Sequence, residues 1–305
     1  MGERVEIRTA GHVDAESGAE VAALLAAAAR EDGRQAVSEQ GRLHLKAADG
    51  GGEGVRHLLA RDGFGALAGY AQIDAEGTAE LVVAPAARGK GAGRALAEAV
   101  REAGAQRVWA HGGHPAARHL AEALGLRLVR ELRQLRRPLT PESVPAEPPA
   151  PPAGVRVRTF VPGRDEEAWL ALNAAAFAHH PEQGGWTARD LRERLAEPWF
   201  DAAGFFLAER ESDGSLAGFH WTKVHPAEEA GGEPVGEVYV VGVDPGFQGG
   251  GLGRILTETG LRHLALDRGL GTVMLYVDAD NTAAVRMYEK LGFTLHEVDL
   301  MYARD

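Results

Sequence analysis

Hydrophobic residues in the second half of the chain alternate between a spacing of two, typical of strands, and a spacing of three or four, typical of helices. The first half opens like the second, with strand-like runs at residues 5–9 and 155–160, each followed by an amphipathic segment. Strands and helices in this order predict an α/β (α+β) fold with one mixed sheet in each half. The strands predicted in the second half are residues 205–210, 216–225, 237–243, 272–278 and 294–302, and the helices are residues 165–178, 187–197, 252–267 and 281–291.

The strand at residues 237–243 leads into a glycine-rich turn at residues 248–253, and a helix follows directly. This arrangement points backbone amides at an anion, and the helix dipole adds a favourable field. No Gly-Lys-Ser/Thr follows, so the turn is not a P-loop, and the preceding hairpin argues against a dinucleotide fingerprint. A plain tight turn is the alternative. In a regular strand, one face carries Val238, Val240 and Gly242, and the other carries Glu237, Tyr239, Val241 and Val243.

The two halves resemble each other. Residues 81–96 align with residues 241–256 at an offset of 160, and residues 124–126 align with residues 291–293 at an offset of 167. Seven prolines from Pro138 to Pro152 lie between the copies and cannot join a helix or a central strand. We therefore predict two domains, residues 1–139 and 154–305, joined by a semi-rigid spacer at residues 140–153. A long surface loop is the alternative for the spacer.

Composition and charge exclude several functions. The 305 residues include no cysteine, which excludes disulfides, cysteine nucleophiles and thiolate metal sites, and the histidine spacings predict no metal site. The chain has neither a membrane-spanning apolar run nor a secretory leader, so we expect a cytoplasmic protein without a membrane partner. Residues 1–140 hold 19 Lys and Arg against 18 Asp and Glu, but residues 141–305 hold 14 against 26. The acidic half is a poor partner for nucleic acid. It either suits a cationic small substrate or is simply a solvated surface.

The glycine-rich turn also carries a resemblance to a known family. Gln248-x-x-Gly251-x-Gly253 resembles the Gln/Arg-x-x-Gly-x-Gly/Ala signature of the GNAT superfamily of N-acetyltransferases, and Asn281, Tyr288 and residues 291–293 resemble its later block. The resemblance implies two tandem GNAT domains, each a mixed, mostly antiparallel sheet with a splayed central strand pair flanked by helices, and acetyl-coenzyme A as co-substrate. The coenzyme contacts that it implies are Val241, Gly242, Val243, Gln248, Gly249, Gly250, Gly251, Leu252, Gly253, Arg254, Asn281, Thr282, Ala283, Ala284, Val285 and Arg286, and in the first half Leu81, Val82, Val83, Arg88, Gly89, Lys90, Gly91, Ala92 and Gly93. Asn281 also fits a helix N-cap.

Direct transfer of an acetyl group to an amine needs a general base and a donor for the leaving thiolate, and it needs no cysteine nucleophile. Glu237, at the start of the splayed strand, is the predicted base; a surface carboxylate is the alternative. Tyr288 is the predicted acid, because its hydroxyl is a neutral donor. A core aromatic on an amphipathic helix is the alternative for Tyr288.

The whole chain resembles a tandem-domain actinobacterial branch of the superfamily that acetylates the cysteinyl amine of a cysteine–glucosamine–inositol conjugate, a thiol pseudodisaccharide. The similarity is carried by residues 218–225, 237–245 and 275–286. It implies substrate contacts at Glu39, Glu182, Lys223, Glu237 and Tyr276. Without it, Glu39 and Glu182 read as exposed acids and Lys223 as an edge-strand charge. We expect a monomer.

The first half keeps the glycine-rich turn but not the predicted catalytic residues. At the two offsets, Glu237 corresponds to Gly77, Tyr288 to Ala121 and Asn281 to His114, while Glu80 aligns with Val240, on the opposite face of a regular strand. We therefore expect a non-catalytic first domain that binds coenzyme or only supports the second. Two alternative functions stay open: a GNAT enzyme for another small amine or a protein N-terminus, and a catalytically inactive acyl-coenzyme-A sensor.

Overall fold

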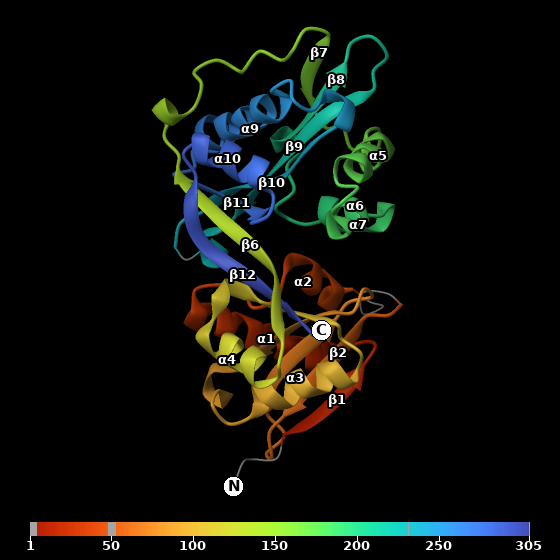
Figure 1. Ribbon diagram of the computed structural model, residues 1–305, viewed down its shortest axis with the longest axis vertical. Helices are drawn as coiled ribbons and strands as arrows, with labels where there is room; N and C mark the ends of the chain where they lie inside the picture. The colour runs from red at the N-terminus through yellow and green to blue at the C-terminus, as the bar shows by residue number, and fades with distance from the viewer. Residues whose placement is uncertain (1–4, 48–52, 231, 305) are drawn as a thin grey trace. The chain divides into compact units, whose positions relative to one another are not determined.

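The computed structural model describes residues 5–47, 53–230 and 232–304, apart from the side chains of Pro181, Glu182 and Glu229. The chain forms two compact units (Figure 1). Unit 1 comprises Met1–Arg133, Asp278–Asp280 and Glu297–Asp305, and unit 2 comprises Gln134–Val277 and Asn281–His296.

Unit 1 is a sheet with helices on both faces. Its strands follow the order β1-β2-β3-β4-β5-β12, in which β4 and β5 are parallel and the other described pairs are antiparallel. Val21 and Leu25 of α1 pack on Val82 on one face, and Leu96 of α3 packs on Ala71 on the other. The elements are β1 (Glu6–Ala10), α1 (Ala15–Asp32), α2 (Glu39–Lys46), β2 (Arg56–Arg61), β3 (Leu67–Ile73), β4 (Thr78–Val83), η1 (Pro85–Ala87), α3 (Ala92–Glu102), β5 (Arg107–Ala110), η2 (His111–Gly113) and α4 (Pro115–Ala123).

Unit 2 repeats this plan with strand order β6-β11-β10-β9-β8-β7. The predicted helices and strands of the second half are all present, with ends that differ by up to five residues. The residues predicted as helix 252–267 form α9 and then a wider π-type turn at His263–Asp267. The elements are η3 (Pro141–Ser143), β7 (Val155–Thr159), α5 (Glu166–Ala176), α6 (Pro181–Gly184), α7 (Ala188–Leu195), η4 (Ala202–Gly204), β8 (Phe205–Arg210), β9 (Leu216–His225), α8 (Ala227–Ala230), β10 (Val235–Val243), η5 (Pro245–Phe247), α9 (Leu252–Arg262), β11 (Thr272–Asp278) and α10 (Thr282–Lys290).

The two faces of the unit 2 sheet have different cores, with α5 and α7 over one face and α9 and α10 over the other (Figure 1). We call the first the aromatic face and the second the aliphatic face. Buried residues of the aromatic face include Trp169, Leu191, Phe205, Phe219, Trp221 and Val240. Those of the aliphatic face include Val238, Leu264, Leu275, Val277, Tyr288 and Phe293.

Two long strands contribute residues to both units. In β6 (Arg127–Pro138) the first seven residues belong to unit 1 and the rest to unit 2, and in β12 (Thr294–Ala303) the order is reversed. Leu300 and Ala303 of β12 pair with Ala110 and Arg107 of β5. The end of the chain therefore completes the unit 1 sheet, and the predicted boundaries at residues 139 and 154 do not coincide with the limits of these units.

The proline-rich segment lies within unit 2. The side chains of Leu139 and Val144 join the aliphatic core, and the amide of Leu139 donates to the carbonyl oxygen of Gly271 at 2.9 Å. Arg262 donates to the carbonyl oxygen of Ala146. The segment is thus packed against unit 2, although proline keeps it out of the sheet.

Candidate functional site

The glycine-rich turn of unit 2 has the backbone geometry that an anion site needs. Gly249 and Gly251 have φ of +83° and +82°, which other residues rarely adopt. Among the described residues, no atom lies within 4 Å of a Cβ built on either glycine. In the same part of the chain no side chain caps α9, which begins at Leu252. The start of α9 therefore lies at the positive end of the helix dipole without a side-chain cap in the described residues.

The central strands of unit 2 separate just before this turn. The parallel register of β10 and β11 joins Gly236, Glu237 and Val238 to Val273, Met274 and Leu275, but both strands continue beyond it. In unit 1, the register of β4 and β5 likewise covers Thr78 to Glu80. The predicted splayed strand pair is therefore confirmed in both units. In unit 2, Val241, Gly242 and Val243 lie on the separated part of β10.

Tyr239 is an extra residue in β10. Val238 pairs with Thr222 of β9 and Val240 pairs with Trp221, so Tyr239 forms a β-bulge. Tyr239 and Val240 both pack on the aromatic face, and Val241 returns to the aliphatic face. The predicted grouping of Glu237, Tyr239, Val241 and Val243 on one face is therefore wrong, because the bulge reverses the alternation after Tyr239.

Glu237 is a buried carboxylate with two basic neighbours. It is 6% exposed, lies directly opposite Lys223 on β9, and its Oε2 is 2.6 Å from Nε2 of His225. The Lys223 ammonium lies over the rings of Trp199 and Tyr239, at 4.4 and 5.2 Å from their centroids. Cation–π contact and an opposite charge together offset the cost of burying Lys223. The surface alternative for Glu237 is therefore wrong, and so is the edge-strand alternative for Lys223, because β9 lies between β8 and β10.

Tyr276 lies on the same face of the sheet as Glu237. Its neighbours on β11, Leu275 and Val277, are in the aliphatic core, so Tyr276 points to the aromatic side. The side chain is 41% exposed, and its hydroxyl accepts a hydrogen bond from Nε2 of Gln134 at 2.7 Å. Two predicted substrate residues, Lys223 and Glu237, thus lie opposite each other, and Tyr276 lies on the same face of the sheet, two residues beyond the partner of Glu237 on β11.

The other two predicted substrate residues lie on short helices. Glu39 begins α2 of unit 1, directly after the N-cap Ser38, and is half-buried. Glu182 belongs to α6 of unit 2, and its side chain lies outside the described part of the structure.

Tyr288 lies on the opposite face of the sheet from Glu237. It is 8% exposed in the aliphatic core, shared with Val238 and Val241, and its ring meets Phe293 edge to face at 5.8 Å. Burial raises the pKa of the phenol to about 12. The hydroxyl therefore keeps its proton at neutral pH, and the core-aromatic alternative describes its packing correctly.

Asn281 is the N-cap of α10. Its side chain accepts a hydrogen bond from the amide of Ala284 at 3.2 Å, which confirms the capping alternative. In unit 1, His114 caps α4 in the same way, through Nδ1 and the amide of Ala116 at 3.1 Å. The two helices therefore begin alike despite different capping residues.

The glycine-rich turn of unit 1 has the same backbone form but carries an internal ion pair. Gly89 and Gly91 have φ of +73° and +97°, and α3 begins at Ala92 without a side-chain cap in the described residues. The Arg88 guanidinium forms two hydrogen bonds of 2.7 Å to the carboxylate of Asp32. The positive charge of Arg88 is therefore neutralised within the unit.

The bulge changes the comparison of Glu237 with unit 1. The register of β3 and β4 is even from Ala79 to Val83, so once Tyr239 is left out, Glu237 corresponds to Thr78 and not to Gly77. Val240, the counterpart of Glu80, shares the aromatic face with Glu237. The expectation that Glu80 lies on the opposite face is therefore wrong.

Glu80 is enclosed by groups of its own unit. It accepts hydrogen bonds from the amide and hydroxyl of Ser38 at 2.9 and 3.0 Å, and Nε2 of His111 is 2.7 Å from its Oε1. Nδ1 of His111 is 3.1 Å from Asp299. Burial opposes a charge on His111, but the hydrogen bonds to Asp299 and Glu80 outweigh it and raise the pKa to about 10. An imidazolium and the N-cap of α2 thus hold the only carboxylate that β4 carries.

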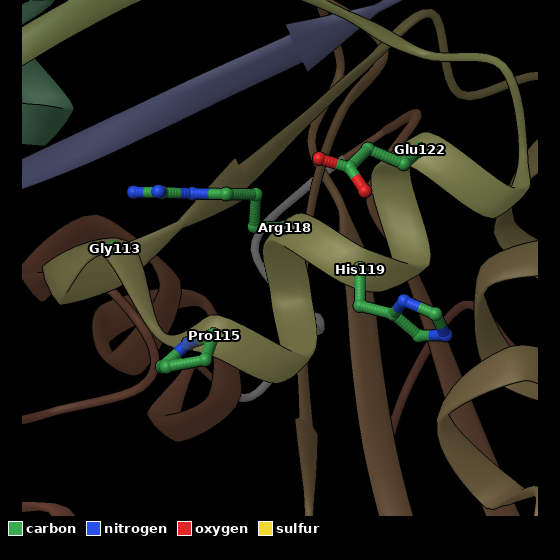
Figure 2. Close-up of a pocket in the computed structure, with 5 residues that line it drawn as sticks. All are labelled: Gly113, Pro115, Arg118, His119 and Glu122. Atoms are coloured by element: carbon green, nitrogen blue, oxygen red, sulfur yellow. The ribbon is translucent and has the colours of Figure 1, made fainter.

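An open surface hollow borders α4 of unit 1, and no predicted site residue lines it. Figure 2 shows that the side chains of Arg118, His119 and Glu122 leave the helix in different directions and do not converge. The hollow is completed by Gly113 and Pro115. In the described residues we find no cluster of three potential metal ligands, and no helix long and apolar enough to cross a membrane.

Sequence reasoning missed His225, the bulge at Tyr239 and the His111 cluster. His225 is two residues beyond Lys223 in the same predicted strand, so strand alternation alone placed it on the face of Lys223. The bulge has no such local signal, since it is visible only in the register with β9. His111 meets Asp299, which is 188 residues away in the chain.

A family model described as the acetyltransferase (GNAT) family matches residues 21–126 and 168–293. The chain therefore belongs to the GNAT family, and it is an acetyltransferase with two GNAT domains. GNAT acetyltransferases take their acetyl group from acetyl-coenzyme A. The predicted fold class and enzyme class are both confirmed.

Several relatives share one name. The chain is 60% identical to the mycothiol acetyltransferase of Streptomyces coelicolor, over 97% of this chain and 94% of that protein. It is 55% identical to the mycothiol acetyltransferase of Thermobispora bispora, over 99% of each. The predicted resemblance to a tandem-domain branch of the superfamily is confirmed by these full-length matches.

Two solved structures support the fold. A GCN5-related N-acetyltransferase from Sphaerobacter thermophilus superposes with a TM-score of 0.66 at 25% identity, covering 97% of this chain and 94% of that one. A tandem GNAT protein from the clavulanic acid biosynthesis pathway gives a TM-score of 0.69 at 20% identity, covering 98% of each chain. The second similarity concerns the fold alone.

Proposed function

We propose that this acetyltransferase acetylates the cysteinyl amine of a cysteine–glucosamine–inositol conjugate, desacetylmycothiol, to give mycothiol. The observation that carries the proposal is that Glu237 lies opposite Lys223 and shares one face of the unit 2 sheet with Tyr276, where β10 and β11 separate. The mycothiol acetyltransferases that match the whole chain support the choice of substrate.

The residues of unit 2 fit acetyl-coenzyme A. The open side of Gly249 and Gly251 and the uncapped start of α9 suit a pyrophosphate. The separated part of β10, from Val241 to Val243, suits the pantetheine arm, with Asn281 and the start of α10 along it. When bound, the coenzyme supplies an acetyl group activated as a thioester.

Glu237 and Tyr288 act from opposite faces of the sheet. Glu237 Oε1 accepts a proton from the substrate ammonium, so that an N–H bond breaks, an O–H bond forms and the amine becomes a nucleophile. The amine nitrogen would then bond to the acetyl carbon while the bond from that carbon to sulfur breaks. Tyr288, protonated at neutral pH, would pass its proton to the departing sulfur and take up the proton that the new amide nitrogen loses. This division of roles would require the amine and the sulfur to meet where β10 and β11 separate.

The remaining predicted contacts concern recognition. Tyr276 and Lys223 are donors for sugar and inositol hydroxyls, and carboxylates at Glu39 and Glu182 accept from them or hold the ammonium. Unit 1 is proposed to be non-catalytic, binding coenzyme at residues 88–93 or only supporting unit 2, because Thr78, Ala121 and an enclosed Glu80 stand where a base and an acid are needed. A monomeric, cytoplasmic enzyme stays a prediction from the sequence.

The test is to incubate the protein with acetyl-coenzyme A and the conjugate and to identify N-acetylated product by mass spectrometry. Parallel reactions contain an aminoglycoside and a peptide with a free N-terminus. We expect product from the conjugate alone; product from another amine and none from the conjugate would contradict the substrate while leaving the family assignment intact.

Two matched variants locate the active unit. Glu237→Gln is expected to lower kcat by about 10²–10⁴, the usual contribution of a general base. Glu80→Gln makes the same change at the corresponding face of unit 1 and is expected to keep kcat within about twofold. Equal losses in both variants would contradict the assignment of catalysis to unit 2.

A further inference from the structure

His225 is the last residue of β9 and lies diagonally across from Glu237. The register pairs His225 with Val235 and Lys223 with Glu237, so His225 and Lys223 flank the carboxylate from one strand. Nε2 of His225 is 2.6 Å from Oε2 of Glu237, and the two side chains are 15% and 8% exposed. A short hydrogen bond between two mostly buried polar groups fixes the orientation of both.

The pair exists because the central hairpin of unit 2 is longer than its copy. In the two hairpins, Gly218 pairs with Val243 and Gly69 pairs with Val83. His225 follows Gly218 by seven residues; the same step from Gly69 ends at Glu76, in the turn after β3. Unit 1 therefore lacks a histidine at this position, as it lacks a carboxylate at the position of Glu237.

A carboxylate that accepts the proton on one oxygen is better oriented when a hydrogen-bond donor holds its other oxygen. A carboxylate has two oxygens that rotate together, so a hydrogen bond to Oε2 sets where Oε1 points. Lys223, opposite Glu237, is already held over two aromatic rings. The Nε2 atom of His225 is placed to donate to the second oxygen, at 2.6 Å from Oε2.

We propose that His225 is a positioning residue for Glu237. Its Nε2–H donates to Oε2 throughout turnover, and Oε1 takes the ammonium proton and later passes it to water. His225 itself neither gains nor loses a proton in this cycle. The inference depends on the proposed role of Glu237 as the base.

The experiment compares His225→Ala and His225→Gln with the unchanged enzyme, measuring kcat and the KM of both substrates. Loss of an orienting partner typically costs about 10–100-fold in activity, so we expect a kcat loss of this size in the alanine variant with little change in KM. Glutamine carries an amide donor of similar reach and should recover much of kcat. As a control, His263→Ala removes another histidine–carboxylate contact of unit 2, Nδ1 to Asp267 at 3.0 Å, and should keep kcat.

Two results would overturn the inference: full kcat in His225→Ala, or equal losses in the alanine and glutamine variants together with a raised KM. A nitrogen NMR spectrum of the histidine rings tests the pair without any substrate. The His225 signal, identified by its absence in His225→Gln, should report the Nε2–H form and should shift in Glu237→Gln. An unshifted signal refutes the pair, whereas an enzyme that leaves the conjugate unacetylated but shows the shift refutes the proposed substrate only.

Discussion

Tyr288 is buried on the face of the sheet opposite the proposed base, and its environment favours the protonated phenol. Because burial raises its pKa to about 12, the hydroxyl can donate to a leaving sulfur at neutral pH. Tyr288→Phe keeps the ring contact with Phe293, so stability should change little. We expect kcat to fall by about 10²-fold at nearly constant KM, measured from initial rates of acetylation.

Tyr302 of unit 1 provides the control for this prediction, since it is also 8% exposed. Tyr302→Phe should leave kcat unchanged. Unchanged turnover in Tyr288→Phe would show that the leaving thiolate is protonated by another group.

His220 makes a different prediction, about stability. Nδ1 donates to the carbonyl oxygen of Leu256 at 2.7 Å, and burial lowers the pKa of His220 from 6.5 to about 4. Between these values the unfolded chain binds a proton that the folded chain does not. The free energy of unfolding of unit 2 therefore falls as the pH falls from 6.5 to 4, by about 3 kcal/mol in total.

His220→Asn keeps a donor toward Leu256 and does not titrate. Urea unfolding at pH 7 and pH 5 should show a smaller acid loss in this variant than in the unchanged protein. An equal loss of unfolding free energy in both proteins would show that His220 does not cause the loss of stability at low pH.

The residues of the candidate site could be predicted where a sequence motif, a resemblance or the alternation of a strand identified them. Glu237 and Tyr288 were predicted from their strand and helix positions beside the signature, whereas Lys223 and Tyr276 were predicted from the resemblance alone. The enclosure of Glu80 was not predictable, because it depends on Ser38 and Asp299, which are distant in sequence and meet only in the folded unit.

At the scale of elements, the two glycine-rich turns are a matched pair. Gly251 and Gly91 each precede a helix and each have positive φ, of +82° and +97°. Alanine at such a position costs about 1–2 kcal/mol and projects a methyl group toward the anion site. Gly251→Ala should raise the KM for acetyl-coenzyme A about tenfold or more.

Gly91→Ala introduces the same strain in unit 1. Because unit 1 is proposed to be non-catalytic, the kcat/KM of the Gly91→Ala variant for acetyl-coenzyme A should stay within about twofold of the value for the unchanged enzyme. Equal effects of the two substitutions, measured from initial rates over a range of coenzyme concentrations, would contradict the division of roles.

The strands and helices of unit 2 follow from local sequence because turns of glycine, proline, serine and aspartate separate strongly periodic segments. Thr187 and Asp190, for example, form the capping box at the start of α7. The face to which each side chain of β10 points could not be predicted from local sequence. One extra residue reverses the alternation without changing the composition of the strand.

At the scale of the molecule, the position of a strand along the chain does not decide to which unit it belongs. Sequence comparison divides the chain near its proline-rich segment, and the family model agrees that there are two copies. Pairing of β12 with β5 joins residues about 190 positions apart, which no local pattern predicts. The last residues therefore stabilise the first unit.

Removal of Glu297–Asp305 should unfold unit 1 in particular. The deletion exposes β5 and removes Leu300, Tyr302 and Asp299, the partner of His111. Burial of two large side chains alone contributes about 3–6 kcal/mol, a large share of the stability of one domain. Hydrogen exchange should show that the amides of β4 and β5 lose protection in this variant. A shorter truncation, after Ala303, should leave the protection of these amides intact. Protection that survives the longer deletion would mean that β12 is dispensable, and that residues 1–139 fold as the sequence repeat alone suggests.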